Sequence, residues 1–474
     1  MKRLITLAIL GGCVLRMAPV WSSIFTGGYV NFASPDAYYQ MGCVAKYYAA
    51  FPHLPISGNF YHIFAAGAAW LFSAGHGSIS FLEHFACFIP VTLFITSAVM
   101  VYFVGKEIFS PRAGLIAVFA FALLPGEYLG RSILGEIDYH AFEVFLSTGA
   151  ILCAVRFVKQ PRSLKSLLNL TLLALLFYLY NRTWPSGSLI ILPVLASFAF
   201  YKNWKYGILF LTLAAALFIP ATYMILKSNL LTMATTAEAQ SGFTGLFSSV
   251  HIIIASLLLI PKLGDKFRWP LFSWTLVFTL ATIIMRRFDY YLIVPLSILL
   301  GGWLVTLKQS AARIAIAGIV FIGCLPGYVL YQKPMVPSPA WHEALNWVRE
   351  NTPEDAVILS WWDYGYWINY ISGRVAYVTP SQEAARIKMV AKWLLNSPPD
   401  ERARPPVTDG VYIIISEQMV SENYLEAIRI WADDKESAAP LITRLFGGDI
   451  EGYRLDYAND EIKVYEVRNV QEAR

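Results

Sequence analysis

Charged residues are scarce in this sequence. Only 15% of its 474 residues are Asp, Glu, Lys or Arg, whereas 57% are hydrophobic. Soluble globular domains carry about 25% charged residues, so the shortage excludes an ordinary soluble domain as the main part of the chain. Most of the protein is predicted to lie in a lipid bilayer.

A strong excess of one charge is missing as well. The formal net charge is only +5, which is too small for a nucleic-acid-binding surface. Nucleic acid is therefore excluded as a partner. The small positive excess is what positively charged cytoplasmic loops would produce in a membrane protein.

Cysteine is sparse, and its spacing excludes two classes of site. The five cysteines stand singly, mostly inside apolar runs, with no CxxC pair. Such a pattern supports neither a cysteine-based metal site nor a disulfide-stabilised secreted domain. The cysteines are Cys13, Cys43, Cys87, Cys153 and Cys324.

Long hydrophobic runs, by contrast, recur throughout the first two thirds of the chain. A bilayer needs roughly 20 apolar helical residues, and the runs predict about eleven spans. The first follows Lys2 and Arg3 without a small-residue cleavage site, so it is interpreted as a retained signal anchor. The predicted spans are 4–24, 86–105, 113–129, 141–157, 166–181, 185–201, 206–226, 248–261, 269–285, 288–306 and 312–331.

Lys and Arg fall on every second loop between these spans, which places those loops in the cytoplasm. The remaining loops then face the outside, including a large first outer loop at 25–85. From about Pro334 the composition becomes that of a soluble domain, with a helix signature at 339–350 and β-like runs at 356–360 and 410–415. We therefore predict a polytopic membrane domain over 1–331 and a small mixed α/β extracytoplasmic domain over 332–474.

The second outer loop contains a D-x-H pair, Asp138 and His140, seven residues after Arg131. A carboxylate and an imidazole two residues apart can converge on one divalent cation, and a carboxylate-rich set suits Mg²⁺ or Mn²⁺. The alternative is an acidic helix N-terminus before the span at 141, of which Glu136 and Glu143 would be part.

Three more polar elements lie in outer loops. Asp36 follows a proline just beyond the first span, where a turn or helix cap is the common role. Glu238 stands in a polar loop segment that reads by itself as solvated loop. Arg286 and Arg287 lie at the outer end of a hairpin of two spans, where lipid phosphates are the default partner and a diphosphate-linked substrate is the specific one.

The most specific string is Trp361-Trp362-Asp363-Tyr364-Gly365-Tyr366-Trp367, which opens the soluble domain. Its indole N–H groups and its carboxylate can surround one small hydroxyl group, and the glycine lets the backbone turn closely. An aromatic cluster that attaches the domain to the membrane is the alternative.

The WWDYG string at 361–365 resembles the signature of the catalytic subunit of oligosaccharyltransferase, the family that N-glycosylates proteins. The other elements follow in the family's order: Asp36, the R-x-x-x-G-x-x-D-x-H pattern from Arg131 to His140, and a T-x-x-E motif that ends at Glu238. The resemblance covers nearly the whole chain. It implies a GT-C type glycosyltransferase with about 11–13 transmembrane helices.

The resemblance also implies roles for single residues. Asp36 and Glu238 would bind the acceptor amide as catalytic residues, and Mn²⁺ or Mg²⁺ would be held by these two with Asp138 and His140. Arg131 would support Asp138. The remaining roles concern substrates. The acceptor would be bound by Trp361, Trp362, Asp363 and, by a looser match, Met419. The lipid phosphate would be bound by Arg287, with Arg286 as the second candidate.

The function implied is en bloc transfer of a glycan from a polyprenyl-phosphate or diphosphate carrier to asparagine in Asn-x-Ser/Thr sequons, with inversion at the anomeric carbon. Acceptor proteins and membrane lipid are the partners, and a single-subunit enzyme in the cell membrane, with its site facing outward, is expected. Two alternatives stay open: a related lipid-phosphate-sugar enzyme such as a protein O-mannosyltransferase, and a polysaccharide or lipid transporter. A transporter would carry its polar residues inside the spans, whereas here they lie in outer loops.

Overall fold

The structure, a computed structural model, divides the chain into two compact units. Unit 1 comprises Met1–Ile24 and Cys43–Lys333, and unit 2 comprises Phe25–Gly42 and Pro334–Arg474. The residues that the structure describes are 1–53, 58–160, 163–205, 207–208, 240–258, 269–308, 310, 314, 318, 334–381, 383–395, 411–433, 440–448 and 452–467.

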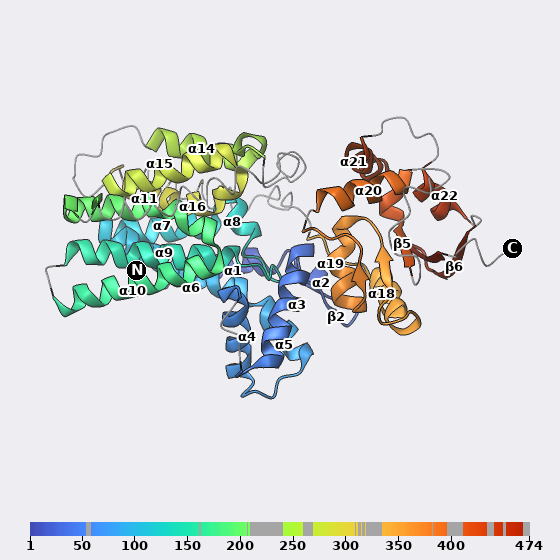
Figure 1. The fold of residues 1–474 in the computed structure, drawn as a ribbon. Coiled ribbons are helices and arrows are strands. Elements are labelled where there is room, and N and C mark those ends of the chain that lie inside the picture. Colours follow the sequence, from blue (N-terminus) through green and yellow to red (C-terminus); the bar gives the residue numbers. More distant parts are fainter. Residues whose placement is uncertain are drawn as a thin grey trace. The chain divides into compact units, whose positions relative to one another are not determined.

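Unit 1 is built from helices throughout the part that the structure describes (Figure 1). Its helices follow most of the predicted spans, while the predicted spans at 206–226 and 312–331 lie almost wholly outside the described residues. The helices are α1 (Lys2–Met17), α2 (Trp21–Ile24), α4 (Phe60–Phe72), α5 (Ile79–Cys87), α6 (Ile89–Ile108), α7 (Pro111–Leu123), α8 (Glu127–Gly130), α9 (His140–Lys159), α10 (Leu164–Thr183), α11 (Pro185–Lys202), α14 (Leu246–Leu258), α15 (Trp269–Ile284) and α16 (Asp289–Leu304).

Local chemistry explains where several of these helices begin. The hydroxyl of Ser110 accepts the Ala113 N–H at the start of α7, and Pro111 occupies the first helical position. The hydroxyl of Ser163 caps α10 in the same way. Such caps satisfy backbone N–H groups that have no partner within the helix.

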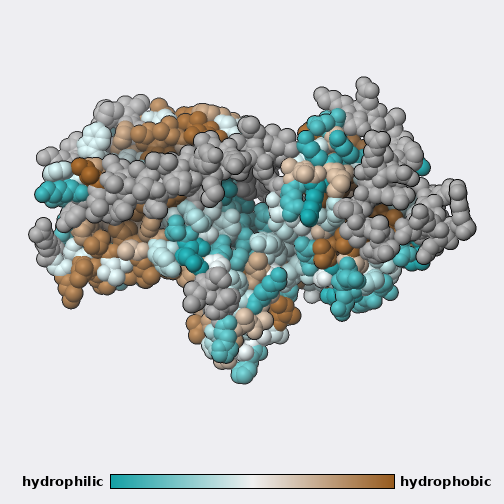
Figure 2. All heavy atoms as spheres, in the orientation of Figure 1, coloured by the Kyte–Doolittle hydropathy of each residue, from teal (hydrophilic) through white to brown (hydrophobic). Residues whose placement is uncertain are grey.

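Among the described residues, three helical segments are long and apolar enough to cross a membrane: Ile79–Ile108, His140–Lys159 and Leu164–Thr183. Shorter apolar helices accompany them, and the predicted number of spans stays a prediction. The segments differ in burial. α9 is buried along nearly its whole length, whereas α10 exposes many leucines, as a helix that faces lipid would. Hydrophobic residues gather over the helices of unit 1 on the face drawn in Figure 2.

Unit 2 combines helices with a mixed five-stranded sheet, which confirms the predicted mixed α/β composition. The strand order is β4-β3-β5-β7-β6. Strand β3 runs parallel to β4 and β5, whereas β7 runs antiparallel to β5 and β6. The strands are β3 (Val357–Leu359), β4 (Val375–Ala376), β5 (Val411–Ser416), β6 (Tyr453–Ala458) and β7 (Ile462–Val467). The two predicted β-like runs correspond to β3 and β5.

Helices pack around this sheet, and the predicted helix at 339–350 is confirmed as α18 (Pro339–Asn351). The described C-terminal part of unit 2 also contains the 3₁₀ turns η6 (Trp362–Tyr364) and η9 (Glu417–Val420), the π-turn η7 (Ile368–Ser372), and the helices α19 (Gly365–Trp367), α20 (Ala384–Leu395), α21 (Glu422–Ala432) and α22 (Leu441–Gly447). The core of unit 2 forms from these faces, with β5 buried along its whole length.

The segment 25–42 belongs to unit 2, although it lies some 300 residues from the rest of that unit in the sequence. It forms a small hairpin of β1 (Phe25–Thr26) and β2 (Tyr29–Val30), followed by the start of α3 (Pro35–Ala50). The Asn31 side-chain oxygen lies 2.7 Å from His342 Nε2, and the ring of Tyr29 stacks on the same imidazole.

Candidate functional site

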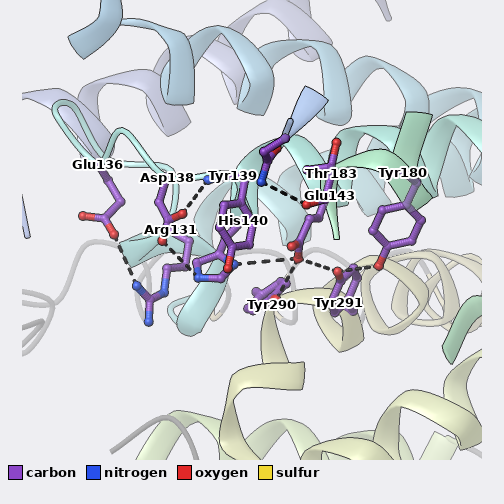
Figure 3. Close-up of polar contacts among 11 residues, drawn as sticks. Arg131, Glu136, Asp138, Tyr139, His140, Glu143, Tyr180, Thr183, Tyr290 and Tyr291 are labelled. Carbon is purple, nitrogen blue, oxygen red and sulfur yellow. Dashed lines mark hydrogen bonds and ion pairs between the residues drawn. The ribbon is translucent and has the colours of Figure 1, made fainter. Parts of the chain in front are cut away.

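The D-x-H pair lies in unit 1 at the junction of the loop 131–139 and α9 (Figure 3). Asp138 and His140 are both buried, and His140 Nε2 lies 3.1 Å from Asp138 Oδ2. Burial opposes ionisation of Asp138, but the pairing with His140 outweighs it and lowers the pKa of the carboxyl to about 2. Asp138 is therefore an anion at neutral pH, as a ligand of a cation must be.

The backbone of this loop is held by α1 and α5. The Leu134 N–H donates to the Arg16 carbonyl at 2.9 Å, and the Gly135 N–H donates to the Cys87 carbonyl at 3.0 Å. Gly135 has φ of +82°, a left-handed conformation that glycine adopts at little cost. Two adjacent backbone N–H groups thus fix the turn of the loop before it reaches Asp138.

Arg16 supports the same loop with its side chain, a residue that the sequence analysis did not single out. It is fully buried in α1, its Nε donates to Ser132 Oγ at 2.8 Å, and its guanidinium lies 3.7 Å from the centre of the Phe94 ring. The sequence did contain a signal for this role, because Arg16 stands inside an apolar run. A charge is costly in a membrane helix, so an arginine there indicates a specific polar partner.

Arg131 was expected to support Asp138. Its Nη1 forms an ion pair with Glu136 Oε1 at 3.2 Å, and its positive charge contributes to the lowered pKa of Asp138. Glu136 is buried. The arginine thus stabilises both acidic residues of the loop, and its expected supporting role stays a prediction.

Glu143 departs from the simple capping role considered for it. It lies one turn after His140, is fully buried, and its Oε2 accepts hydrogen bonds from the hydroxyls of Tyr290, at 2.8 Å, and Tyr291. The Tyr180 hydroxyl donates in turn to Tyr291. The result, visible in Figure 3, is a polar chain from the D-x-H pair to α16 and α10.

The two neighbouring arginines of unit 1 have different surroundings. Arg286 forms an ion pair with Glu127. Arg287 lies with its guanidinium 4.4 Å from the centre of the Trp184 ring, a cation–π contact, and its Nε has no hydrogen-bond partner among the described residues. Arg287 therefore retains donor capacity for an anionic ligand, and its expected rank ahead of Arg286 stays a prediction.

The WWDYG string lies in unit 2 directly after β3 and forms η6 and the start of α19. Trp361 is buried, while Trp362 and Asp363 are half-buried. Burial raises the pKa of Asp363 to about 7. The Trp362 indole N–H is buried without a hydrogen-bond partner among the described residues, so it is a donor available to a ligand.

Asp36 opens α3, whose first turns pack on this string within unit 2. Tyr39 stacks on Tyr366 with ring centres 5.0 Å apart, and Tyr38 makes an edge contact with Trp367 at 6.3 Å. Met419 is fully buried in η9, and its sulfur accepts a hydrogen bond from the Ser360 hydroxyl at 3.8 Å. Its side chain is therefore part of the core, and its expected contact with the acceptor stays a prediction.

The residues expected to hold the metal are not found as one cluster. The described residues contain no group of three or more His, Cys, Asp or Glu side chains placed to hold an ion. Asp138 and His140 are adjacent in unit 1, Asp36 belongs to unit 2, and Glu238 lies outside the described residues. The donor chemistry of the adjacent pair fits a divalent cation.

Two curated relatives come from Archaeoglobus fulgidus. The chain is 24% identical over 485 residues to dolichyl-phosphooligosaccharide-protein glycotransferase 1, in a match that covers 80% of the chain and 79% of the relative. It is 28% identical over 219 residues to glycotransferase 3 of the same organism, in a match that covers 42% of the chain but only 25% of that relative.

Solved structures share the fold. The archaeal oligosaccharyltransferase AglB from Archaeoglobus fulgidus, in complex with an inhibitory peptide and a dolichol-phosphate, matches with a TM-score of 0.73 and 18% identity over 97% of this chain and 79% of that one. The oligosaccharyltransferase of that organism in complex with Zn and sulfate matches with a TM-score of 0.68 and 20% identity, over 91% and 70%. These matches confirm the coarser part of the predicted fold, a helical body with a mixed sheet domain, and the membrane topology stays a prediction.

The family assignment rests on residues 22–295. The family described as "Oligosaccharyl transferase STT3, N-terminal" matches residues 22–295, which is more than half of the chain. The chain belongs to the oligosaccharyl transferase STT3 family.

Proposed function

We propose that the protein transfers a glycan from a lipid phosphate or diphosphate carrier to the side-chain amide of asparagine in Asn-x-Ser/Thr sequons. The observation that carries the proposal is the contact, within unit 2, between the Asp36 helix and the segment that directly follows the WWDYG string, through Tyr39 and Tyr366. The Asp36 carboxylate is suited to bind the acceptor amide. The indole N–H groups of the WWDYG string are suited to bind the Ser or Thr hydroxyl two residues after the asparagine.

The acceptor amide is a poor nucleophile because its nitrogen lone pair is delocalised into the carbonyl. In the proposed reaction, Asp36 and Glu238 accept hydrogen bonds from this amide and orient it toward the anomeric carbon. The amide nitrogen forms a bond to that carbon from the face opposite the lipid phosphate. The bond to the phosphate oxygen breaks with its electron pair on the leaving phosphate, and one amide proton passes to water. Configuration at the anomeric carbon is thereby inverted.

Asp138 and His140, with Asp36 and Glu238, would hold Mn²⁺ or Mg²⁺. A bound divalent cation supplies positive charge that stabilises the leaving lipid phosphate. A structure of similar fold that was solved in complex with Zn and sulfate supports the proposed metal dependence. Arg287 donates to the same phosphate, and the ring of Trp184 positions its guanidinium from one side.

Selectivity for the acceptor rests on the hydroxyl of Ser or Thr. Trp362 presents a buried indole N–H without a partner among the described residues, and Asp363 presents an acceptor. An acceptor peptide that lacks the hydroxyl leaves the Trp362 indole N–H unsatisfied, and sites of this kind reject such analogues strongly.

The test is in-vitro transfer by the purified full-length protein. The assay contains a lipid-linked oligosaccharide extract, a fluorescent Asn-x-Thr peptide and Mn²⁺, with or without a chelator. Asp36→Ala is expected to lower kcat strongly and Asp363→Ala to raise the acceptor KM. Glu383→Gln, at an exposed carboxylate of the same unit, is the control and should behave as the wild type.

Different outcomes separate the alternatives. A mobility shift that requires metal, and that an Asn→Gln peptide abolishes, supports asparagine glycosylation. Modification of Ser or Thr in peptides without asparagine would assign the chain to O-glycosylation instead. Transfer that persists unchanged in Asp36→Ala would refute the proposed role of that carboxylate.

A further inference from the structure

Glu143 is a buried carboxylate that the proposed reaction does not use. It stands on α9 one helical turn after His140, with no exposed surface on its side chain. A carboxylate in such a place is costly unless hydrogen bonds compensate for the lost water. Here the hydroxyls of Tyr290 and Tyr291 both donate to one of its oxygens, Oε2, and so fix the carboxylate in one orientation.

The imidazole of His140 lies between two carboxylates (Figure 3). Its Nε2 is 3.1 Å from Asp138 Oδ2, and its Nδ1 is 3.7 Å from Glu143 Oε2. Two ligand atoms on one divalent cation, each about 2.1 Å from it, are roughly 3 Å apart when they occupy neighbouring positions. The separation of Nε2 and Oδ2 therefore suits a shared cation, with Nε2 as the metal-binding nitrogen.

If Nε2 binds the cation, the ring proton must be on Nδ1, which faces Glu143. Neither His140 Nδ1 nor Glu143 Oε1 has a hydrogen-bond partner among the described residues, so the ring nitrogen can donate and the carboxylate can accept one more hydrogen bond. Metal-binding histidines commonly donate their second ring N–H to a carboxylate, which fixes the tautomer and the ring orientation and strengthens the ligand.

We infer that Glu143 is the positioning residue for His140: its carboxylate accepts a hydrogen bond from Nδ1–H and so directs the Nε2 lone pair toward the divalent cation. The inference rests on the proposed metal-dependent function. Glu143 is itself held by other residues, because the hydroxyls of Tyr290 and Tyr291 donate to its carboxylate and Tyr180 donates to Tyr291. Three helices, α9, α10 and α16, thereby set the orientation of one metal ligand.

Metal affinity, measured without donor or acceptor, tests this role. The full-length protein in detergent is titrated with Mn²⁺, and free Mn²⁺ is followed by its electron paramagnetic resonance signal. Glu143→Gln keeps the shape of the side chain but removes its charge, and it is expected to raise the Mn²⁺ Kd about 10- to 100-fold. His140→Ala, which removes the ligand itself, should raise the Kd at least as much.

Asp289→Asn is the matched control. Asp289 is another fully buried carboxylate of unit 1 that lies 2.8 Å from an imidazole nitrogen, that of His251. It also accepts the Glu127 N–H at 3.0 Å. Its removal should lower the melting temperature as much as Glu143→Gln does but leave the Mn²⁺ Kd near that of the wild type.

A wild-type Kd in Glu143→Gln would overturn the inference, as would an equal loss of affinity in Asp289→Asn, because the effect would then be general. If Glu143→Gln fails to fold, Tyr290→Phe takes its place. It retains the carboxylate and removes one of its two phenol donors, so a smaller rise in Kd is expected and an unchanged Kd would count against the role. Failure of the wild type to bind Mn²⁺ would instead overturn the proposed metal dependence itself.

Discussion

Asp363 is a carboxylate whose ionisation is made difficult by its surroundings. Burial raises its pKa to about 7, so in the free protein it changes charge near neutral pH. An ionised carboxylate is the stronger hydrogen-bond acceptor for a Ser or Thr hydroxyl. The raised pKa therefore links acceptor recognition to pH.

The expected result is a pH-dependent KM. As the pH falls from 8 to 6, the ionised fraction of Asp363 falls from most of the protein to about one tenth, and the KM for the Asn-x-Thr peptide should rise by up to about tenfold. Asp363→Asn should show a high KM that is flat over the same range. Steady-state kinetics at four or five pH values measure this, and an equal pH slope in the variant would exclude Asp363 as its source.

Arg286 and Arg287 offer a matched pair at the same position in the fold. Arg287 retains donor capacity, whereas Arg286 is paired with Glu127. Lysine keeps the charge but loses the planar fork that binds phosphate oxygens in pairs. We therefore expect Arg287→Lys to raise the KM for the lipid-linked donor about tenfold, and Arg286→Lys to change it less than about threefold. Donor titration at saturating peptide measures both, and a reversed order would assign the phosphate to Arg286.

At the scale of elements, close helix contacts hold the helical body together. A Cβ atom on Gly114 in α7 would lie 2.5 Å from the Tyr102 carbonyl oxygen in α6, and one on Gly105 in α6 would lie 2.9 Å from the Gly114 backbone. Small residues allow such backbone approaches in membrane helices, where packing rather than water drives association.

Even one methyl group should disturb this contact. Gly114→Ala forces α6 and α7 apart and is expected to destabilise the protein by about 1–3 kcal/mol, measured as a lower melting temperature in detergent. Gly447→Ala is the control, because a Cβ atom there meets nothing within 4 Å. A melting temperature in Gly114→Ala equal to that of the control would show that the two helices part without cost.

At the scale of the whole molecule, the alternation of charged loops makes a prediction about sidedness. Lys165 at the start of α10 should face the cytoplasm, and Glu383 in unit 2 should face outward. In a variant without native cysteines, Glu383→Cys should react with a membrane-impermeant maleimide in intact cells, whereas Lys165→Cys should react only after lysis. Both positions are exposed, so burial does not explain a difference. The reverse labelling pattern would show that the topology is opposite to the predicted one.

Much of the fold was predictable because the pattern of hydrophobic residues follows from residue types alone. The runs at 141–157 and 166–181 became α9 and α10, and the β-like run at 410–415 became β5. The domain ranges 1–331 and 332–474 stay predictions. The two compact units differ from them in one respect, because segment 25–42 belongs to the same unit as the C-terminal residues. A contact between residues so far apart in sequence leaves no local pattern.

The sequence by itself determined the membrane-like composition, the helices and strands that follow from periodicity, and the WWDYG and D-x-H motifs, since these depend on residue type and spacing. Only the tertiary structure decided which buried groups support them. Arg16 under the D-x-H loop, the tyrosine contacts of Glu143, and the packing of Tyr39 on Tyr366 each join distant segments. The reason is physical. A buried polar group is stable only with a hydrogen-bond partner, and tertiary packing determines which residue lies close enough to be that partner.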